Sequence, residues 1–198
     1  NPGSSAVASC HAFVVYKIVT QSSGATLIEV PTIDWGHNLK AFPANIRDDT
    51  KVIFIANPNN PTGTYNSHQE VHCLLQNIPS SILVVLDCAY FEYVKKSDYV
   101  DPLALLNEFD NLLVTKSFSK IQGLASARIG YGIANAELIE VLNRIRQPFN
   151  VNSFAQELAC EAINDKEHIK KSIDLNLAEG TFLFTELTQL GLECIPSV

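Results

Sequence analysis

Residues 115–128 carry the side chains of this sequence that are best suited to covalent chemistry. Ser117 and Ser119 precede Lys120, and Arg128 follows that lysine by eight residues. Apolar runs flank the stretch on both sides, so we expect Lys120 to be held between two buried strands. Desolvation favours the neutral form of a buried lysine, and a neutral amine can form a Schiff base.

The neighbours of Lys120 could bind an anion. Ser117 and Ser119 offer hydroxyl groups and Arg128 offers a planar guanidinium, a set that suits phosphate. An amine nucleophile beside a phosphate site suggests pyridoxal phosphate as a cofactor. The alternative is an ordinary surface loop, because short patterns of serine and lysine also occur without any function.

The composition describes a globular protein with a sizeable core. Of 198 residues, 46% are hydrophobic and 18% are charged, which is enough for one full domain and part of a second. The net charge of −7 and the pI of about 5.2 argue against nucleic acid or an anionic membrane as a partner. No apolar run reaches membrane-spanning length.

Five scattered cysteines without a C-x-x-C pair favour reduced thiols in a cytoplasmic protein over a disulfide framework or a metal site. The chain opens on Asn-Pro-Gly rather than methionine, so we expect a piece of a longer protein.

Strands alternate with helices over most of the chain. After a weak strand at 6–8, apolar runs predict strands at 25–31, 51–56, 82–86, 112–115 and 128–134, and a further strand beginning at 192–195. Apolar stripes and capping residues predict helices at 67–77, 101–109, 136–146, 152–163 and 166–190. One more helix near the start of the chain is expected to present a single apolar face made of Phe13, Tyr16, Ile18 and Val19.

The alternation indicates a three-layer α/β sandwich with a mostly parallel sheet. Only about a dozen residues separate the strands at 112–115 and 128–134, and a helical crossover barely fits that length. We therefore expect the last strand to run antiparallel. Residues 1–146 are expected to form most of a large domain, and residues 147–198 a helical connection and the beginning of a smaller α/β domain.

Polar residues stand where three of these strands end. Asn60 follows the strand at 51–56, Asp87 follows the next strand, and Lys120 follows the one after that. Ligands of open α/β sheets bind beyond the carboxyl ends of the strands, so we expect these side chains to meet. Burying a carboxylate is costly unless it is paired, so a cationic partner is expected for Asp87. The alternatives are a surface turn at 57–63 and a capping role for Asp87.

Three stretches resemble the fold-type-I, pyridoxal-phosphate-dependent aminotransferases. They are N-P-N-N-P-T-G at 57–63, D-C-A-Y-F-E-Y at 87–93 and S-F-S-K with a later arginine at 117–128. Within that superfamily, the sequences of residues 48–64, 120–134 and 146–153 resemble those of the histidinol-phosphate aminotransferase branch. The resemblance covers nearly the whole chain and implies that family's large-domain fold.

The resemblance assigns a role to each candidate residue. Lys120 would hold the cofactor covalently and then move the proton from the substrate Cα. Asp87 would pair with the pyridinium nitrogen, which keeps the ring an electron sink. Tyr90 and Asn60 would hydrogen-bond the phenolic oxygen of the ring. The remaining roles are phosphate binding by Ser117, Ser119 and Arg128, and stacking on the ring by Phe13.

The sequence departs from the family pattern at a few positions. Ser9 and His11 stand where the family often has prolines, and Cys88 replaces a residue that is commonly glutamate. Both ends of the family's chain are expected to be absent, among them the residues that reach a partner subunit and the arginine that binds the substrate carboxylate. The family also implies a homodimer, and no metal ligand is expected.

Three functions remain open. The first is transamination between histidinol phosphate and 2-oxoglutarate, which yields imidazole acetol phosphate and glutamate in histidine biosynthesis. The second keeps the cofactor but acts as an aromatic amino-acid aminotransferase or as a decarboxylase of a phosphorylated amino acid. The third is a non-catalytic fragment. Arg144 and Arg146 are candidates by charge for the substrate phosphate, with a solvated helix face as the alternative.

Overall fold

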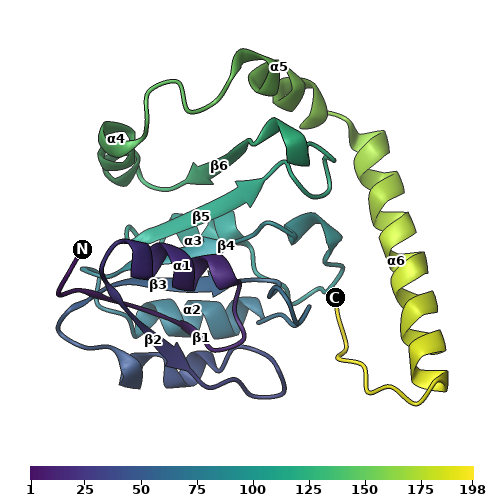
Figure 1. Cartoon of the computed structure of the whole chain (residues 1–198), viewed down its shortest axis with the longest axis horizontal. Coiled ribbons are helices and arrows are strands. Elements are labelled where there is room, and N and C mark those ends of the chain that lie inside the picture. Colours follow the sequence, from purple (N-terminus) through teal and green to yellow (C-terminus); the bar gives the residue numbers. More distant parts are fainter.

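Six strands form one sheet at the centre of the computed structural model, which describes residues 1–198. Their order across the sheet is β2-β1-β3-β4-β5-β6, and every pair is parallel except β5 with β6 (Figure 1). The strands are β1 (Ser5–Ser9), β2 (Thr26–Val30), β3 (Thr50–Ala56), β4 (Leu83–Asp87), β5 (Leu112–Ser117) and β6 (Gly130–Ile133). The expected mostly parallel sheet is confirmed.

The edge strand β6 is antiparallel to β5, as predicted from the short connection. It begins two residues later than expected, because Arg128 has a left-handed backbone with φ of 54° that no extended strand contains. Gly130 then pairs with Ser117, and a Cβ at this glycine would lie 2.7 Å from the carbonyl oxygen of Lys116. This close approach explains the glycine at the start of the strand.

Helices lie on both faces of the sheet, which makes the three layers. They are α1 (Val14–Ser22), α2 (His68–Gln76), α3 (Pro102–Leu106), α4 (Ala136–Ile145), α5 (Ser153–Ala162) and α6 (Lys166–Gln189). The main core lies between the sheet and α2 with α3, where Ile53 and Ile55 of β3 are fully buried. Successive strand residues point to opposite faces, so Phe54 and Ala56 pack with α1 instead.

The first helix buries only part of the face that was predicted. Tyr16 and Thr20, one turn apart, are its buried residues, whereas Ile18 is 54% exposed and Val19 is 41% exposed. Phe13 precedes the helix as its N-cap residue. Tyr16 of the predicted face therefore makes the contact with the sheet, and Ile18 and Val19 of the same face do not.

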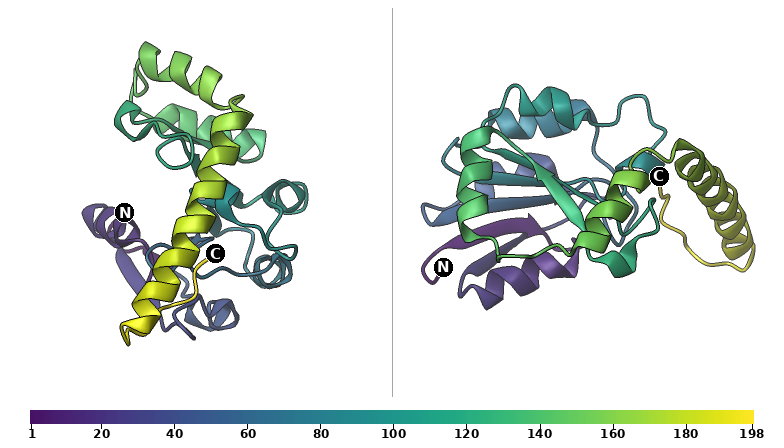
Figure 2. Two further views of the ribbon diagram at one scale, coloured as in Figure 1. Left: turned by 90° about the vertical axis from the view of Figure 1, so that its right-hand side faces the viewer. Right: turned by 90° about the horizontal axis from the view of Figure 1, so that it is seen from above.

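The segment after α4 differs most from the expected pattern. The predicted strand at 192–195 is not formed; the chain after α6 is irregular until the Val198 N–H donates to the Gly63 carbonyl at 3.0 Å. No residue of α6 is buried, and Figure 2 shows this helix beside the sheet rather than on it. The proposed domain division at residue 146 stays a prediction. None of the helices has the length and apolarity needed to cross a membrane.

Candidate active site

The ends of β3, β4 and β5 bring the predicted residues to one place. A small cavity there is lined by side chains that follow each of these strands, namely Asn60, Asp87, Tyr90 and Lys120, together with Phe13 and Tyr16 of the α1 region, Ala56, Pro58 and Ala89. Parallel strands place their carboxyl ends at one edge of the sheet, and this topology assembles residues that are far apart in the sequence.

The turn after β3 is built into the protein rather than lying on its surface. Asn57 and Asn59 are 0% and 3% exposed. Asn57 is fixed by two hydrogen bonds with the backbone of Asn66, both 2.9 Å long. The Asn59 amide donates to the His11 carbonyl and the Thr62 hydroxyl, each at 2.8 Å. This bracing fixes the backbone from which Asn60 projects.

Asp87 accepts two hydrogen bonds from the chain. The phenol of Tyr16 donates to Oδ2 at 2.7 Å, and the backbone N–H of Ala89 donates to Oδ1 at 3.1 Å. No lysine, arginine or histidine side chain of the chain pairs with this carboxylate, so the expectation of a cationic partner for Asp87 stays a prediction. Burial and the neighbouring Asp87 charge raise the pKa of Tyr16 far above its usual value, so its phenol remains a donor.

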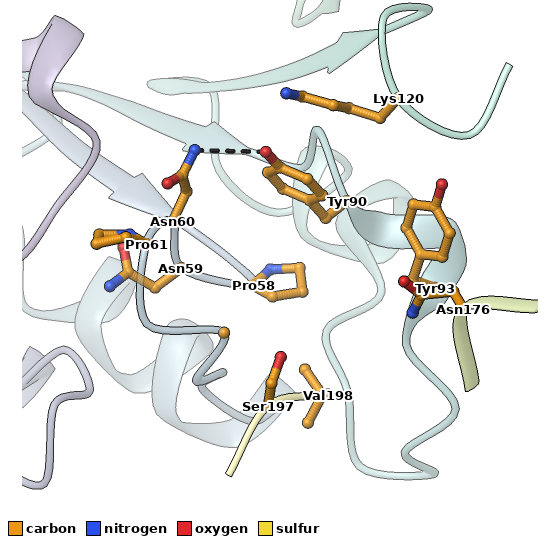
Figure 3. Close-up of a pocket in the computed structure, with 11 residues that line it drawn as sticks. Pro58, Asn59, Asn60, Pro61, Tyr90, Tyr93, Lys120, Asn176, Ser197 and Val198 are labelled. Atoms are coloured by element: carbon orange, nitrogen blue, oxygen red, sulfur yellow. Dashed lines mark hydrogen bonds between the residues drawn. The ribbon is translucent and has the colours of Figure 1, made fainter. Parts of the chain in front are cut away.

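Tyr90 occupies the centre of the group (Figure 3). It is the N-cap residue of the short 3-10 helix η3 (Phe91–Tyr93), and its phenol oxygen accepts a hydrogen bond from the Asn60 amide at 3.3 Å. The Lys120 amine lies 5.0 Å from the centroid of the Tyr90 ring, within the range of a cation–π contact. Amine, phenol and amide thus converge from three strand ends.

Lys120 is not buried as expected. It lies in the loop after β5, three residues beyond the strand end at Ser117, and it is exposed. Strand β5 ends at Ser117 and its antiparallel partner β6 starts only at Gly130, so the Lys120 side chain lies outside both strands. The amine reaches the cavity from the open side.

The predicted phosphate ligands are near one another in the chain, and a hydrogen bond joins two of them. Ser117 Oγ accepts from the Ser119 backbone N–H at 3.0 Å, and Arg128 Nη1 donates to the Ala125 carbonyl at 2.7 Å. Arg128 is exposed. None of the three lines the cavity formed around Asp87 and Tyr90.

Phe13 lies at the opposite wall of that cavity. It is half-buried and packs edge-to-face on Tyr16, with ring centroids 5.7 Å apart. Tyr16 in turn stacks on Phe54 of β3 at 4.8 Å. The aromatic cluster fixes the Tyr16 phenol and leaves the Phe13 ring at the cavity surface.

A second, larger cavity of about 350 Å³ adjoins the first and shares Asn60, Tyr90 and Lys120 with it (Figure 3). Its other walls come from Tyr93 of η3, Asn176 of α6, and the 197–198 segment. Asn59 also lines this cavity. Its Oδ1 atom is buried and has no hydrogen-bond partner. The cavity therefore offers mostly polar, uncharged groups next to one amine.

The family model for aminotransferases of class I and II matches residues 1–198. The chain belongs to this family. It is 50% identical to histidinol-phosphate aminotransferase 2 of Pseudomonas fluorescens Pf-5 over 99% of its own length and 53% of that protein's. It is 46% identical to histidinol-phosphate aminotransferase 2 of Ralstonia nicotianae, again over 99% of its length and 52% of the relative's. This aminotransferase chain thus spans about half the length of its curated relatives.

Solved aminotransferase structures confirm the expected fold type. Histidinol-phosphate aminotransferase from Sinorhizobium meliloti in complex with pyridoxal-5′-phosphate superposes with a TM-score of 0.92 at 28% identity, covering 100% of this chain and 54% of that one. Aspartate aminotransferase from Thermus thermophilus with maleate gives 0.89 at 20% identity, covering 100% and 54%. At the latter identity the likeness shows the fold alone.

Some site residues of this aminotransferase could not be found from its sequence. Tyr16 looked like one member of an apolar stripe, and its partner Asp87 is 71 residues away. Asn176 lies on a helix with no buried residue, which gives no pattern to interpret. Tyr93 was part of the recognised stretch at 87–93, and that signal could have included it in the site.

No group of three or more histidine, cysteine, aspartate or glutamate side chains is arranged to hold a metal ion. Arg144 and Arg146 both lie on the exposed surface of the α4 region. Arg144 pairs with Glu140 at 3.9 Å, and Arg146 donates to Asn143 and Asn150. Neither lines the two cavities of the aminotransferase chain.

Proposed function

We propose that the complete protein is a pyridoxal-phosphate-dependent aminotransferase that transfers the amino group of histidinol phosphate to 2-oxoglutarate, giving imidazole acetol phosphate and glutamate. The observation that carries the proposal is the identity of 46–50% over nearly the whole chain with proteins named histidinol-phosphate aminotransferase. The convergence of Asn60, Asp87, Tyr90 and Lys120 supports the reaction class independently.

The residues of the small cavity fit pyridoxal phosphate. The Asp87 carboxylate borders the cavity and has no cation of the chain beside it, which suits a protonated ring nitrogen. Asn60 and Tyr90 offer an amide and a phenol to the ring's phenolic oxygen, and Phe13 offers an aromatic face. When bound, the cofactor supplies an electron sink for the carbon that loses its amino group.

Each residue then has one task in the proposed reaction. The Lys120 amine would hold the cofactor and would take the proton from the substrate Cα. The buried phenol of Tyr16 holds the Asp87 carboxylate in its orientation. The Asn60 and Tyr90 groups hold the ring so that the amine and the substrate Cα stay close together.

The cofactor phosphate is assigned to Ser117, Ser119 and Arg128. The proposal rests on their residue types and on their common loop around Lys120. Ser119 makes no side-chain hydrogen bond within the chain, and Arg128 uses only one of its guanidinium nitrogens on the Ala125 carbonyl. These free donors support phosphate binding, because charge-assisted hydrogen bonds to an anion are the strong ones.

We also propose that the protein is a homodimer located in the cytoplasm. The exposed face of α1 supports an interface, since Val14 is 60% exposed and Ile18 is 54% exposed on one side of the helix. Its five cysteines are all free, which supports a reducing compartment. Sedimentation equilibrium of the complete protein tests the dimer.

A covalent label tests the assignment of Lys120. Borohydride reduction of the complete, cofactor-loaded protein should fix the cofactor on Lys120, and Lys120→Ala should abolish turnover. Peptide mass mapping locates the label. A label on Lys116 would overturn the assignment, and the absence of any bound-cofactor absorbance would favour a non-catalytic fragment.

A single-turnover half-reaction tests the substrate. Histidinol phosphate should convert the bound-cofactor absorbance to that of the amine form, and 2-oxoglutarate should restore it. Histidinol without phosphate should react much more slowly, because a site built for phosphate would be left unpaired. Faster conversion of tyrosine or phenylalanine would favour the aromatic aminotransferase, and release of carbon dioxide would favour the decarboxylase.

A further inference from the structure

Lys116 and Glu92 form an ion pair beside the candidate site. Lys116 Nζ donates to Glu92 Oε1, and the two side chains are only 17% and 19% exposed. The same amine lies 4.2 Å from the centroid of the Phe91 ring. One amine thus contacts both residues that directly follow Tyr90 in the sequence.

This pair differs from the other ion pairs of the chain. In five of the other six pairs, at least one side chain is more than half exposed. In the sixth, Lys17–Glu29, the side chains are 47% and 40% exposed. Exposed pairs contribute little to stability. Removal of one partner from a shielded pair is costly, because the remaining charge is left uncompensated.

The pair joins the two segments that carry Tyr90 and Lys120. Lys116 belongs to β5 and stands four residues before Lys120, while Glu92 belongs to η3, whose N-cap is Tyr90. The ladder between β4 and β5 ends at Asp87 with Thr115, and the last backbone link is the Cys88 N–H to the Thr115 carbonyl at 2.8 Å. Beyond that point the backbone hydrogen bonds of η3 are local to its own turn.

We propose that Lys116 and Glu92 are positioning residues that fix the Tyr90 phenol relative to the Lys120 amine. The proposal rests on the proposed function, since it assigns a role to residues around the same cofactor site. Neither residue lines either cavity, so neither touches the cofactor or the substrate directly. They act through η3: the ion pair and the Phe91 contact hold the turn against β5, and Tyr90 is fixed at its start.

The tests are Lys116→Met and Glu92→Gln in the complete protein. Two readouts report the site rather than the fold: the dissociation constant for pyridoxal phosphate, and the pH midpoint of the bound-cofactor absorbance. A displaced Tyr90 would weaken one hydrogen bond to the cofactor, so we expect each variant to bind the cofactor about tenfold more weakly and to shift the midpoint. Lys116→Arg should restore both, because it keeps the charge that pairs with Glu92.

Two further variants complete the design. Lys17→Met breaks the exposed Lys17–Glu29 pair and should leave both readouts unchanged. The double variant Lys116→Met with Glu92→Gln leaves no unpaired charge, so its own cofactor affinity, expected below that of the wild type, tests the proposal if the single variants do not fold. In a double-mutant cycle its loss of cofactor affinity should be clearly smaller than the sum of the two single losses.

The outcomes separate this proposal from the proposed function. Wild-type protein without any bound-cofactor absorbance would refute the proposed function and this inference with it. Wild-type protein with that absorbance, and variants that melt at lower temperature while keeping the cofactor affinity and the absorbance midpoint, would overturn this inference alone. Loss that Lys116→Arg does not restore would also overturn it.

Discussion

At Asp87 the chain provides neutral hydrogen-bond donors and no cationic side chain. The Tyr16 phenol and the Ala89 N–H orient the carboxylate without neutralising its charge. A carboxylate held in this way stays available to a positively charged ligand group. A neighbouring lysine or arginine would compete with that group for the carboxylate. The fully shielded alternative, a buried cationic side chain, would suit a structural role better than a cofactor site.

Asp87→Asn tests the charge while keeping the shape. In the complete protein we expect turnover to fall by about 10²-fold or more, the scale seen when one preorganised electrostatic contact is removed. Single-turnover rates with histidinol phosphate measure the effect. Asp49→Asn is a suitable control, because it removes a carboxylate that accepts from Ser5 and Arg47 at the amino end of β1, whereas the site lies at the carboxyl ends of the strands. Near-wild-type rates in Asp87→Asn would contradict the proposed role.

Tyr16→Phe tests the orientation of that carboxylate. The substitution removes a hydrogen bond to a charged group, a loss worth about 1.5–3 kcal/mol of unfolding free energy when the site is shielded. Tyr65→Phe removes the same kind of bond, to Asp98 at 3.0 Å, but at an exposed position. There we expect a change within about 0.5 kcal/mol. Urea unfolding of both variants measures the difference, and equal losses would contradict the buried geometry.

His37 links the first and third strands on the side of the sheet that leads to the site. Its ring is 6% exposed and bonds Ser9 Oγ through Nδ1 at 2.6 Å and the Ala56 carbonyl through Nε2 at 2.8 Å. A carbonyl can only accept, so Nε2 carries the proton, and in the neutral ring Nδ1 accepts from the serine hydroxyl. Burial lowers the pKa of His37 below its ordinary value of 6.5, and the hydrogen bond to Ala56 only partly opposes this.

The stability of the β1–β3 region should therefore depend on pH below neutrality. The unfolded chain binds a proton at His37 as the pH falls through about 6.5, while the folded chain does not until a lower pH, so stability is lost on acidification. Urea unfolding at pH 7.5 and pH 5.5 should show a smaller loss in His37→Gln than in wild type. His11→Gln, at an exposed histidine, serves as a control that leaves the wild-type pH dependence in place. An identical loss in His37→Gln would contradict the assignment.

For the whole molecule, the sequence predicted the sheet well because each strand has its own local signal. Apolar runs marked β3, β4 and β5, and the short connection marked β6 as antiparallel. The same reasoning placed Asn60, Asp87 and Lys120 at one edge, since parallel strands share an edge. Contacts that depend on three-dimensional packing had no local signal. Tyr16 with Asp87 and Lys116 with Glu92 are such contacts, at separations of 71 and 24 residues.

The farthest such contact joins the turn after β3 to the last residues of the chain. Gly63 has φ of +70°, and a Cβ placed there would lie 2.1 Å from Ser197 Oγ and 3.1 Å from its Cα. Val198 also donates its N–H to the Gly63 carbonyl at 3.0 Å. Since Ser197 and Val198 line the larger cavity with Asn60, this contact sets one wall of the cavity that adjoins the proposed cofactor site.

Gly63→Ala should therefore have two separable effects. The positive φ alone costs about 1–2 kcal/mol for a residue with a side chain. The clash with Ser197 adds a displacement of the cavity wall, so the KM for the amino donor should rise in the complete protein.

Gly191→Ala is the matched control: Gly191 has φ of +79° and no heavy atom within 4 Å of its added Cβ, so it tests the backbone cost alone. The double variant Gly63→Ala with Ser197→Gly removes the nearest clashing atoms and should recover part of the KM. A KM that rises equally in Gly63→Ala and Gly191→Ala would show that the contact with residue 197 does not shape the site.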